Sequence, residues 1–121
     1  MIVLDLPYPV SNNKNARMVN GRMVISAEAR AYKNTVGWIA KSVGAKVQKG
    51  DLCVTVNYKP RMNKDGSASK VRMDIDNVLK VMFDALNGIA WVDDSQIVKL
   101  IAMVDKPCES GGLKVIIEAN T

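Results

Sequence analysis

The sequence predicts one small α/β domain of the α+β type, in which two main helices pack on a mixed sheet. Its 121 residues suffice for one hydrophobic core, and 48% of them are hydrophobic, so disorder is not expected. Two segments carry apolar residues at helical spacing, and four others are short and apolar or alternating, as strands are. We expect the order β-(hairpin)-α-β-α-β-β within a single domain over residues 1–121.

The N-terminal part of the chain is predicted to form a strand and then a small hairpin. Residues 2–6 are mainly apolar, and Pro7 and Pro9 end this strand because proline cannot donate a ladder hydrogen bond. The stretch MVNGRMV at residues 18–24 places an Asn-Gly pair between two apolar pairs, which is a strong signal for a tight β-hairpin turn.

The first helix is predicted over about Ala27–Val43. Ser26 precedes it as a good N-cap residue, and Glu28 places a negative charge in the first turn, where the helix dipole favours one. Gly44 marks the end of this helix. Its apolar residues recur at intervals of three and four: Ala29, Tyr32, Val36, Ile39, Ala40 and Val43.

The central segment is predicted to form a strand, a polar loop and the second helix. Residues 52–58, LCVTVNY, alternate between apolar and polar and are rich in β-branched side chains. Residues 59–72 have a net charge of +4 and contain proline and glycine, as surface loops do. The second helix is predicted over about Asp76–Asn87, with Gly88 as its stop.

The C-terminal part is predicted to add two strands. Residues 89–92 are short and apolar, and a strand follows at residues 96–104. Residues 107–112 contain proline and glycine and are predicted to turn, and residues 113–118 form the last strand. We expect these last two strands to pair with each other as a hairpin.

Aromatic residues are scarce, with two Trp, three Tyr and one Phe, so the core is expected to consist mainly of Val, Ile, Leu, Met and Ala. For Tyr32, Trp38 and Met18, a place in the core is preferred over a dimer or DNA contact. Trp91 is expected to pack at the loop that positions the two aspartates following it.

The composition excludes several classes of protein. The chain has no histidine, which rules out His-ligated zinc, a His general base and the Ser-His-Asp triad. No apolar run is long enough to span a membrane, and residues 1–10 carry no basic leader. Cys53 and Cys108 form no CxxC motif, so we expect a reduced, cytoplasmic setting.

The charges are unevenly distributed along the chain. Residues 74–94 carry five Asp and one Lys, a net charge of −4, whereas the other 100 residues have a net charge of +9. A basic body around an acidic centre suits a polyanionic ligand and a metal-dependent site. Alternatively, the positive charge serves only solubility, and charge alone does not choose between these two interpretations.

The second helix is predicted to present a polar face. On a wheel of about 100° per residue, Asp76, Asn77, Lys80 and Asp84 lie on one side, and Phe83 lies at the border. Asp84 lies two turns from Asp76 and is therefore not expected to bind the same ligand directly. The other side is apolar and consists of Val78, Val81, Met82, Ala85 and Leu86.

Three carboxylates are expected to converge at the start of this helix. Asp74 precedes Asp76 by two residues, and a returning loop brings Asp93 or Asp94 back to the same place. Such carboxylates repel one another unless a cation is bound, and Mg²⁺ prefers oxygen ligands. The set suits metal-assisted phosphoryl transfer, with Lys80 assisting the scissile or leaving oxygen.

Structural roles for the same residues stay open. Taken alone, Asp74 or Asp76 can serve as an N-cap, and Lys80 as an ordinary surface partner. Asp93 and Asp94 serve equally well as a turn pair. For any single aspartate the structural role is the stronger interpretation, whereas the set as a whole favours a functional site.

Four motifs of this chain resemble those of the RusA family of Holliday-junction resolvases, which bacteria and prophages encode. They are LPYPVSNN at residues 6–13, ISAEARAY at 25–32, DIDNVLKVMFDAL at 74–86 and WVDDSQIV at 91–98. A late Gly-Gly turn also matches, so the resemblance covers most of the chain.

The resemblance implies a bacterial or phage-encoded endodeoxyribonuclease that depends on Mg²⁺, for which Mn²⁺ substitutes. It implies a homodimer whose two active sites cut two strands of a four-way junction symmetrically. It implies a catalytic set in which the aspartates also bind the metal: Asp74, Asp76, Lys80 and Asp94. It implies supporting roles for two neighbouring residues, Asn77 and Asp93.

Basic residues outside the motifs are the expected DNA contacts, and no membrane partner is expected. Phosphate contacts are predicted for five residues: Lys14, Arg17, Arg22, Lys70 and Arg72. The resemblance adds Phe83, a helix aromatic that packs or stacks at the junction.

Two other hypotheses stay open: a non-catalytic DNA-binding module, and a small metal-binding or partner-binding protein without a nucleic-acid role.

Overall fold

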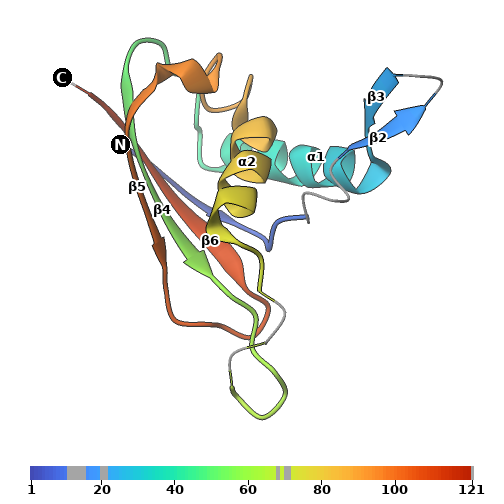
Figure 1. The fold of residues 1–121 in the computed structure, drawn as a ribbon. Coiled ribbons are helices and arrows are strands. Elements are labelled where there is room, and N and C mark those ends of the chain that lie inside the picture. The colour runs from blue at the N-terminus through green and yellow to red at the C-terminus, as the bar shows by residue number, and fades with distance from the viewer. Residues whose placement is uncertain (11–15, 20–21, 68, 70–71, 121) are drawn as a thin grey trace.

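The computed structural model describes residues 1–10, 16–19, 22–67, 69 and 72–120, with the backbone alone for 16–19 and 22–25. Its elements follow the predicted order and confirm the predicted fold class (Figure 1). They are β1 (Ile2–Leu6), β2 (Ala16–Val19), β3 (Arg22–Ile25), α1 (Ala27–Ser42), β4 (Leu52–Lys59), α2 (Ile75–Leu86), the 3-10 turn η2 (Asp94–Gln96), β5 (Ile97–Val104) and β6 (Gly112–Ala119).

Four of the strands form one mixed sheet in the order β1-β6-β4-β5. β4 and β5 run parallel, whereas β6 is antiparallel to both of its neighbours, β1 and β4. The predicted hairpin between the last two strands is therefore wrong. Burial gives the physical reason, because β5 is exposed along most of its length and suits the edge of the sheet, while β6 has a row of covered side chains. The covered side chains of β6 are Leu113, Val115 and Ile117.

The connection from β5 to β6 crosses the end of β4. The backbone N–H of Asp105 donates to the carbonyl of Tyr58 at 2.7 Å. The N–H of Cys108 donates to the carbonyl of Pro60 at 3.0 Å, and Met62 N–H donates to the carbonyl of Cys108 at 3.1 Å. These bonds satisfy backbone groups at the crossing, where the chain leaves the edge strand and enters the middle of the sheet.

The short strands β2 and β3 form a separate two-stranded sheet. They pair antiparallel with Val19 opposite Arg22, which confirms the predicted hairpin. Residues 20–21 lie outside the described residues, and so does the side chain of Met18, for which a place in the core was predicted.

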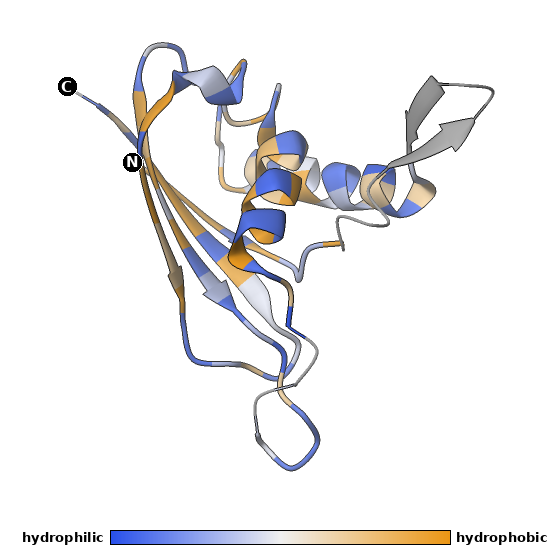
Figure 2. Cartoon of the chain, in the orientation of Figure 1, coloured by the Kyte–Doolittle hydropathy of each residue, from blue (hydrophilic) through white to orange (hydrophobic). Residues whose placement is uncertain are grey.

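Helices α1 and α2 lie on the same side of the four-stranded sheet (Figure 1) and cover one of its faces. Apolar segments of the strands and the apolar side of α2 meet there, as the hydropathy colouring of Figure 2 shows. The predicted apolar face of α2 is confirmed, because its five members are the buried residues of that helix: Val78, Val81, Met82, Ala85 and Leu86.

The structure confirms one aromatic placement on α1 and contradicts another. Tyr32 is buried and donates its hydroxyl proton to the carbonyl of Pro7 at 2.8 Å, and burial raises the pKa of this phenol. Trp38 is 71% exposed, so the prediction of a core position for it is wrong. The reason is helical geometry, since Trp38 stands midway between the buried residues Val36 and Ala40 and therefore points away from both.

The helix boundaries lie within one residue of those predicted. The amide of Ala29 donates to Ser26 Oγ at 3.1 Å, which confirms the N-cap of α1.

Cys53 and Cys108 are both free thiols. Within the described part of the chain, no helix combines the length and the apolar character that crossing a membrane requires.

Candidate active site

A pocket of about 410 Å³ brings three of the four predicted catalytic side chains together. Asp76 and Lys80 reach it from α2, and Asp94 reaches it from the turn that follows. The loop after α2 therefore returns to the helix, as the sequence predicts. We call this site the acidic pocket, and it is lined by Asp76, Leu79, Lys80, Phe83, Asp84 and Asp94.

Helix α2 presents charged side chains to the acidic pocket because its opposite face is committed to the core. Asp76, Lys80 and Asp84 follow one another at intervals of four residues and are all exposed. Asn77, for which a supporting role is implied, is half-buried and is not among the lining residues of this pocket.

A tight turn after α2 sends the chain back toward the acidic pocket. Gly88 adopts a φ of 81°, which glycine tolerates best, and its N–H donates to the carbonyl of Trp91 at 2.7 Å. The indole of Trp91 is fully buried and donates from Nε1 to Asn87 Oδ1 at 2.6 Å. It packs edge-on against Phe83, with ring centroids 6.3 Å apart. Trp91 therefore packs at this loop as predicted.

Asp93 and Asp94 have different surroundings although they are adjacent. The carboxylate of Asp93 accepts a hydrogen bond from Ser95 N–H at 3.1 Å and caps η2. Hydrogen bonds from Ser95 hold the pKa of Asp93 below its ordinary value. Asp94 is the residue of the pair that lines the acidic pocket. The structural role that stayed open for this pair thus falls to Asp93.

Gln96 fixes the position of this turn and was missed by sequence reasoning. Its Oε1 accepts from the amides of Val92 at 2.8 Å and Asp93 at 3.1 Å. Its Nε2 donates to the carbonyls of Gln48 at 3.1 Å and Gly50 at 2.9 Å, which ties the turn to the segment before β4. The signal was present, because Asp followed by Gln three residues later is the pattern of a capping box.

Asp74 occupies the N-cap position of α2, but its side chain makes no capping hydrogen bond. Asp74 therefore stands at the N-cap position, but its side chain does not perform the capping role that was left open for it. The chain before it is held by the N–H of Met73, which donates to the hydroxyl of Tyr58 at 3.2 Å. The hydroxyl of Tyr58 in turn lies 2.9 Å from the hydroxyl of Tyr8. Asp74 itself is not among the lining residues of the acidic pocket.

The carboxylates of the described residues do not form a ready-made metal cage. Among residues 1–10, 26–67, 69 and 72–120, whose side chains are described, no group of three or more His, Cys, Asp or Glu side chains is arranged to hold a metal ion. Two carboxylates of the predicted set, Asp76 and Asp94, nevertheless share one pocket. Mg²⁺ commonly binds through one or two carboxylates and keeps several waters, so these donors fit it chemically.

Lys33 of α1 supports the end of α2 and was also missed. Helix α2 has no basic residue in its last turn, although its C-terminal carbonyls favour one. Lys33 Nζ supplies the charge by donating to the carbonyls of Asp84 at 3.0 Å, Ala85 at 3.3 Å and Asn87 at 2.7 Å. Burial lowers the pKa of Lys33, and the charge of Asp84 partly offsets this. Nothing in the spacing of the sequence predicts this contact between two helices.

The sequence model of one protein family, described as Endodeoxyribonuclease RusA, matches residues 7–118. The chain belongs to the RusA family. Crossover junction endodeoxyribonucleases from Enterobacteria phage 82 and from Escherichia coli K12 are 36% and 34% identical to it over 110 residues. A relative with the same name from Shigella sonnei is 36% identical over 110 residues. Each of these alignments covers 90% of this chain and 86% of the relative.

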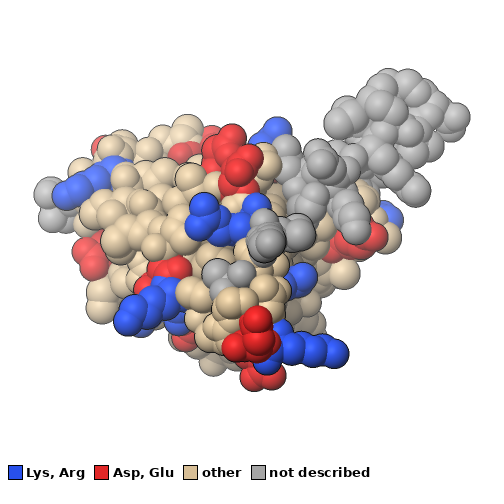
Figure 3. All heavy atoms as spheres, turned by 60° about the horizontal axis from the view of Figure 1, so that its bottom comes forward, with Lys and Arg blue, Asp and Glu red and all other residues tan. Residues whose placement is uncertain are grey.

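Membership of the RusA family makes the basic side chains relevant, but only some of them are described. Lys14 and Lys70 lie outside the described residues. Arg17 and Arg22 lie in β2 and β3, where only the backbone is described. Arg72 is exposed, three residues before α2 begins. On the face in Figure 3, basic and acidic side chains are interspersed.

Proposed function

We propose that this chain is an endonuclease that resolves four-way DNA junctions by hydrolysing phosphodiester bonds in the acidic pocket. One observation carries the proposal: in a member of the RusA family, Asp76 and Lys80 of α2 line one pocket together with Asp94 of η2. The crossover junction endodeoxyribonucleases that it resembles supply the class of substrate.

We infer that a divalent cation, Mg²⁺ or Mn²⁺, acts as cofactor in this pocket. Asp76 and Asp94 supply hard oxygen donors from the pocket. Asp74 lies outside the lining residues and is proposed as the third donor from the family motif, and its carboxylate is not used as a helix cap. When bound, the ion supplies positive charge beside the scissile phosphate and favours deprotonation of the attacking water.

The chain's own side chains have separate tasks in this proposal. The ammonium of Lys80 donates to an oxygen of the scissile phosphate and stabilises the negative charge that grows there during hydrolysis. Leu79 and Phe83 form an apolar wall of the pocket, which orients the substrate and limits access of water. Gln96 and Asp93 hold the turn that carries Asp94 and act as positioning residues.

We further propose a homodimer that packs through the open face of the sheet. One row of neighbouring residues crosses all four strands on this face: Val3, Ile116, Thr55 and Ile101. It is mainly apolar and has no helix over it, since both helices lie on the other side (Figure 1).

The charges beside this row complement a second copy of the chain. Lys114 lies two residues to one side of Ile116 on β6, and Glu118 lies two residues to the other side. A two-fold axis along the apolar row places each Lys114 opposite Glu118 of the partner and each Ile116 opposite its own copy. This self-complementarity is what a two-fold interface requires.

The proposed activity is tested with a synthetic four-way junction and a linear duplex of matched sequence, each with and without Mg²⁺. We expect paired, symmetric cuts in the junction alone, and only with the metal. Cleavage of both substrates at equal rates would contradict junction selectivity, and cleavage without a divalent cation would contradict the cofactor.

A second candidate function is a junction-binding module without catalysis. It is favoured by the lack of a three-ligand metal cluster among the described residues. The same experiment separates the two candidates, because such a module binds the junction with or without Mg²⁺ and leaves every strand intact.

A further inference from the structure

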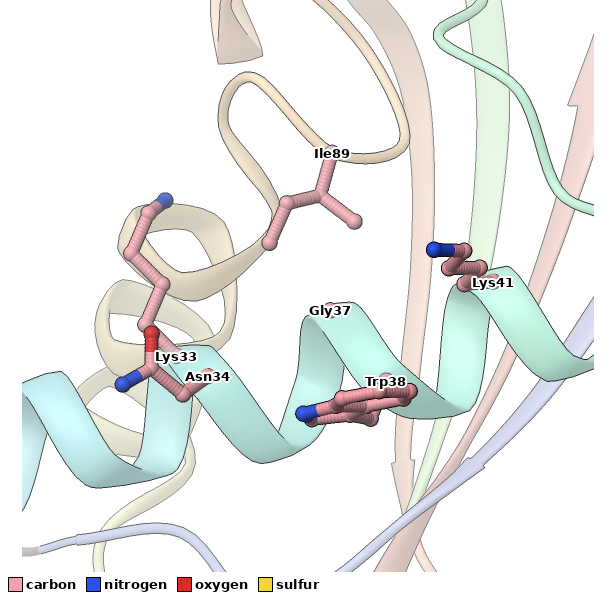
Figure 4. A pocket seen from close by; sticks show the side chains of 6 residues that line it. All are labelled: Lys33, Asn34, Gly37, Trp38, Lys41 and Ile89. Atoms are coloured by element: carbon pink, nitrogen blue, oxygen red, sulfur yellow. The ribbon is translucent and has the colours of Figure 1, made fainter.

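A second pocket, of about 380 Å³, lies on the outer side of α1. It extends over Gly37, with Ile89 on one side and Trp38 on the other, and Lys41 lies one turn beyond (Figure 4). We call it the Trp38 pocket, and its lining residues are Lys33, Asn34, Gly37, Trp38, Lys41 and Ile89.

Trp38 is the most unusual residue of this pocket, because a tryptophan gains more than most residues from burial. Its side chain is 71% exposed, whereas the chain's other tryptophan, Trp91, is fully buried. Gly37 beside it carries no side chain that would fill the space between the indole and Ile89. An exposed indole at the edge of a hollow is a surface on which another flat ring can stack.

The charges around this indole select the ligand. Of the two lysines that line the pocket, Lys33 directs its ammonium at the carbonyls that end α2, so Lys41 supplies the charge for a ligand. No acidic residue is among the lining residues, whereas the acidic pocket is lined by three aspartates. Lys41 Nζ lies 5.7 Å from the centroid of the Trp38 ring, so a phosphate attached to a stacked base comes within its reach. Asn34 adds an amide with both a donor and an acceptor for the edge of a base.

One hydrogen bond at the C-terminal end of α2 connects the linings of the two pockets. Lys33 lines the Trp38 pocket, and its Nζ donates to the carbonyl of Asp84, which lines the acidic pocket. The Trp38 pocket is therefore linked through α2 to the pocket in which we place the scissile phosphate. At a branch point base stacking is interrupted, so an unpaired base is cheapest to extrude there.

We propose that the Trp38 pocket binds one unpaired nucleobase and its adjoining phosphate, by stacking on Trp38 and pairing charge with Lys41. This inference rests on the proposed function, since that function supplies the nucleic acid. It adds a second contact, outside the acidic pocket and outside the motifs shared with the RusA family, that holds a strand beside the cutting site.

The two tryptophans make a direct test possible. Trp91 is fully buried, so a collisional quencher such as acrylamide reports mainly on Trp38. A single-stranded oligo(dT) is titrated into the full-length protein in EDTA, which prevents cleavage. We expect quenching of Trp38 emission and protection of this residue from acrylamide, with no comparable change when a fully paired duplex is added.

Binding of the oligonucleotide and of a four-way junction is then compared between variants. We expect Trp38→Ala to weaken single-strand binding by about 10-fold or more, Trp38→Phe to retain most of it, and Lys41→Gln to flatten its salt dependence. Val98→Ala, at another exposed apolar residue, serves as the matched control.

The outcomes distinguish this inference from the proposed function. Junction cleavage with no response of Trp38 to single strands overturns the nucleobase site and leaves the proposed function intact. Protection of Trp38 that rises with protein concentration in the absence of DNA also overturns it, because the pocket is then an interface between copies. Quenching without any cleavage supports the site and contradicts the nuclease.

Discussion

At the residue scale, the adjacent aspartates of the turn after α2 show how one motif divides its tasks. Asp93 uses its carboxylate to cap η2, and Asp94 lines the acidic pocket. Two neighbouring carboxylates that both faced the pocket would add repulsion there. Hydrogen bonds from Ser95 hold the carboxylate of Asp93 at the start of η2, so of the two aspartates only Asp94 lines the acidic pocket.

Asp76→Asn should reduce junction cleavage by about 100-fold or more and leave junction binding intact, because the amide removes the charge but not the shape of the side chain. Single-turnover cleavage and a binding titration in EDTA measure the two effects separately. Asp51→Asn, at an exposed residue before β4, is the matched control and should cleave normally. Full activity of the Asp76 variant in Mg²⁺ would contradict the metal-site proposal.

Asp93 should give the fold a dependence on acidic pH. Its folded-state pKa lies below the ordinary value of 3.8, so its carboxylate stabilises the fold above that pH. This stabilisation is lost as the pH falls from the unfolded-state value through the folded-state value. Thermal unfolding followed across this acidic range should show a smaller pH dependence for Asp93→Asn than for the parent, and equal dependence in both would contradict the capping role.

At the element scale, the turn between α2 and β5 is held mainly by side chains. Trp91 fixes it to α2. Gln96 accepts two hydrogen bonds from amides within the turn and donates two to the segment before β4. Asp94 therefore sits on a segment anchored on both sides, although the segment is short. A catalytic carboxylate held in this way loses little freedom when substrate binds.

Gln96→Ala should lower both stability and cleavage, because it removes the acceptor of two amides and the donor to two carbonyls. We expect a loss of about 1–3 kcal/mol in the free energy of unfolding, measured by chemical denaturation. The cleavage rate should fall further than the small unfolded fraction explains, since Asp94 is no longer held in place. Lys99→Ala, at an exposed residue of β5, is the control and should change neither quantity.

The helices and the β2–β3 hairpin could be predicted from the sequence, whereas the pairing of β6 could not. The apolar face of α2, the N-cap at Ser26 and the glycine stops depend on neighbouring residues, so local patterns contain them. The position of β6 depends on which strand accepts it in space, and a short turn wrongly favoured β5. Likewise, the motifs predicted that Asp94 returns to α2, but no spacing rule predicted that Lys33 supports the same helix.

At the scale of the whole molecule, one face of the sheet carries the helices and the other is open. Ile101 and Leu100 are adjacent on the edge strand β5, point to opposite faces and are 41% and 40% exposed. Ile101 pairs with Thr55 in the apolar row of the open face, whereas Leu100 pairs with the buried Val54 on the helix side. The two residues thus form a matched pair for testing the proposed dimer.

Ile101→Asp should convert the dimer to a monomer, since two carboxylates would be buried at the interface, while Leu100→Asp should leave it a dimer. Sedimentation of both variants over a range of concentrations measures this. The monomeric variant should nick a junction without paired incisions. Dissociation by Leu100→Asp alone would place the interface at the helix side of the sheet instead.

The position of β6 also has a consequence for how the molecule is made. The strand that completes the middle of the sheet is the last in sequence, and it pairs with the first strand, with Ile117 opposite Ile2. Contacts between such distant residues close slowly. Without β6, the strand β1 has no partner in this sheet, and β4 and β5 are left as a pair with an unpaired edge on β4. We therefore expect folding to wait for this strand, so that the acidic pocket is held on a finished sheet only after β6 has been made.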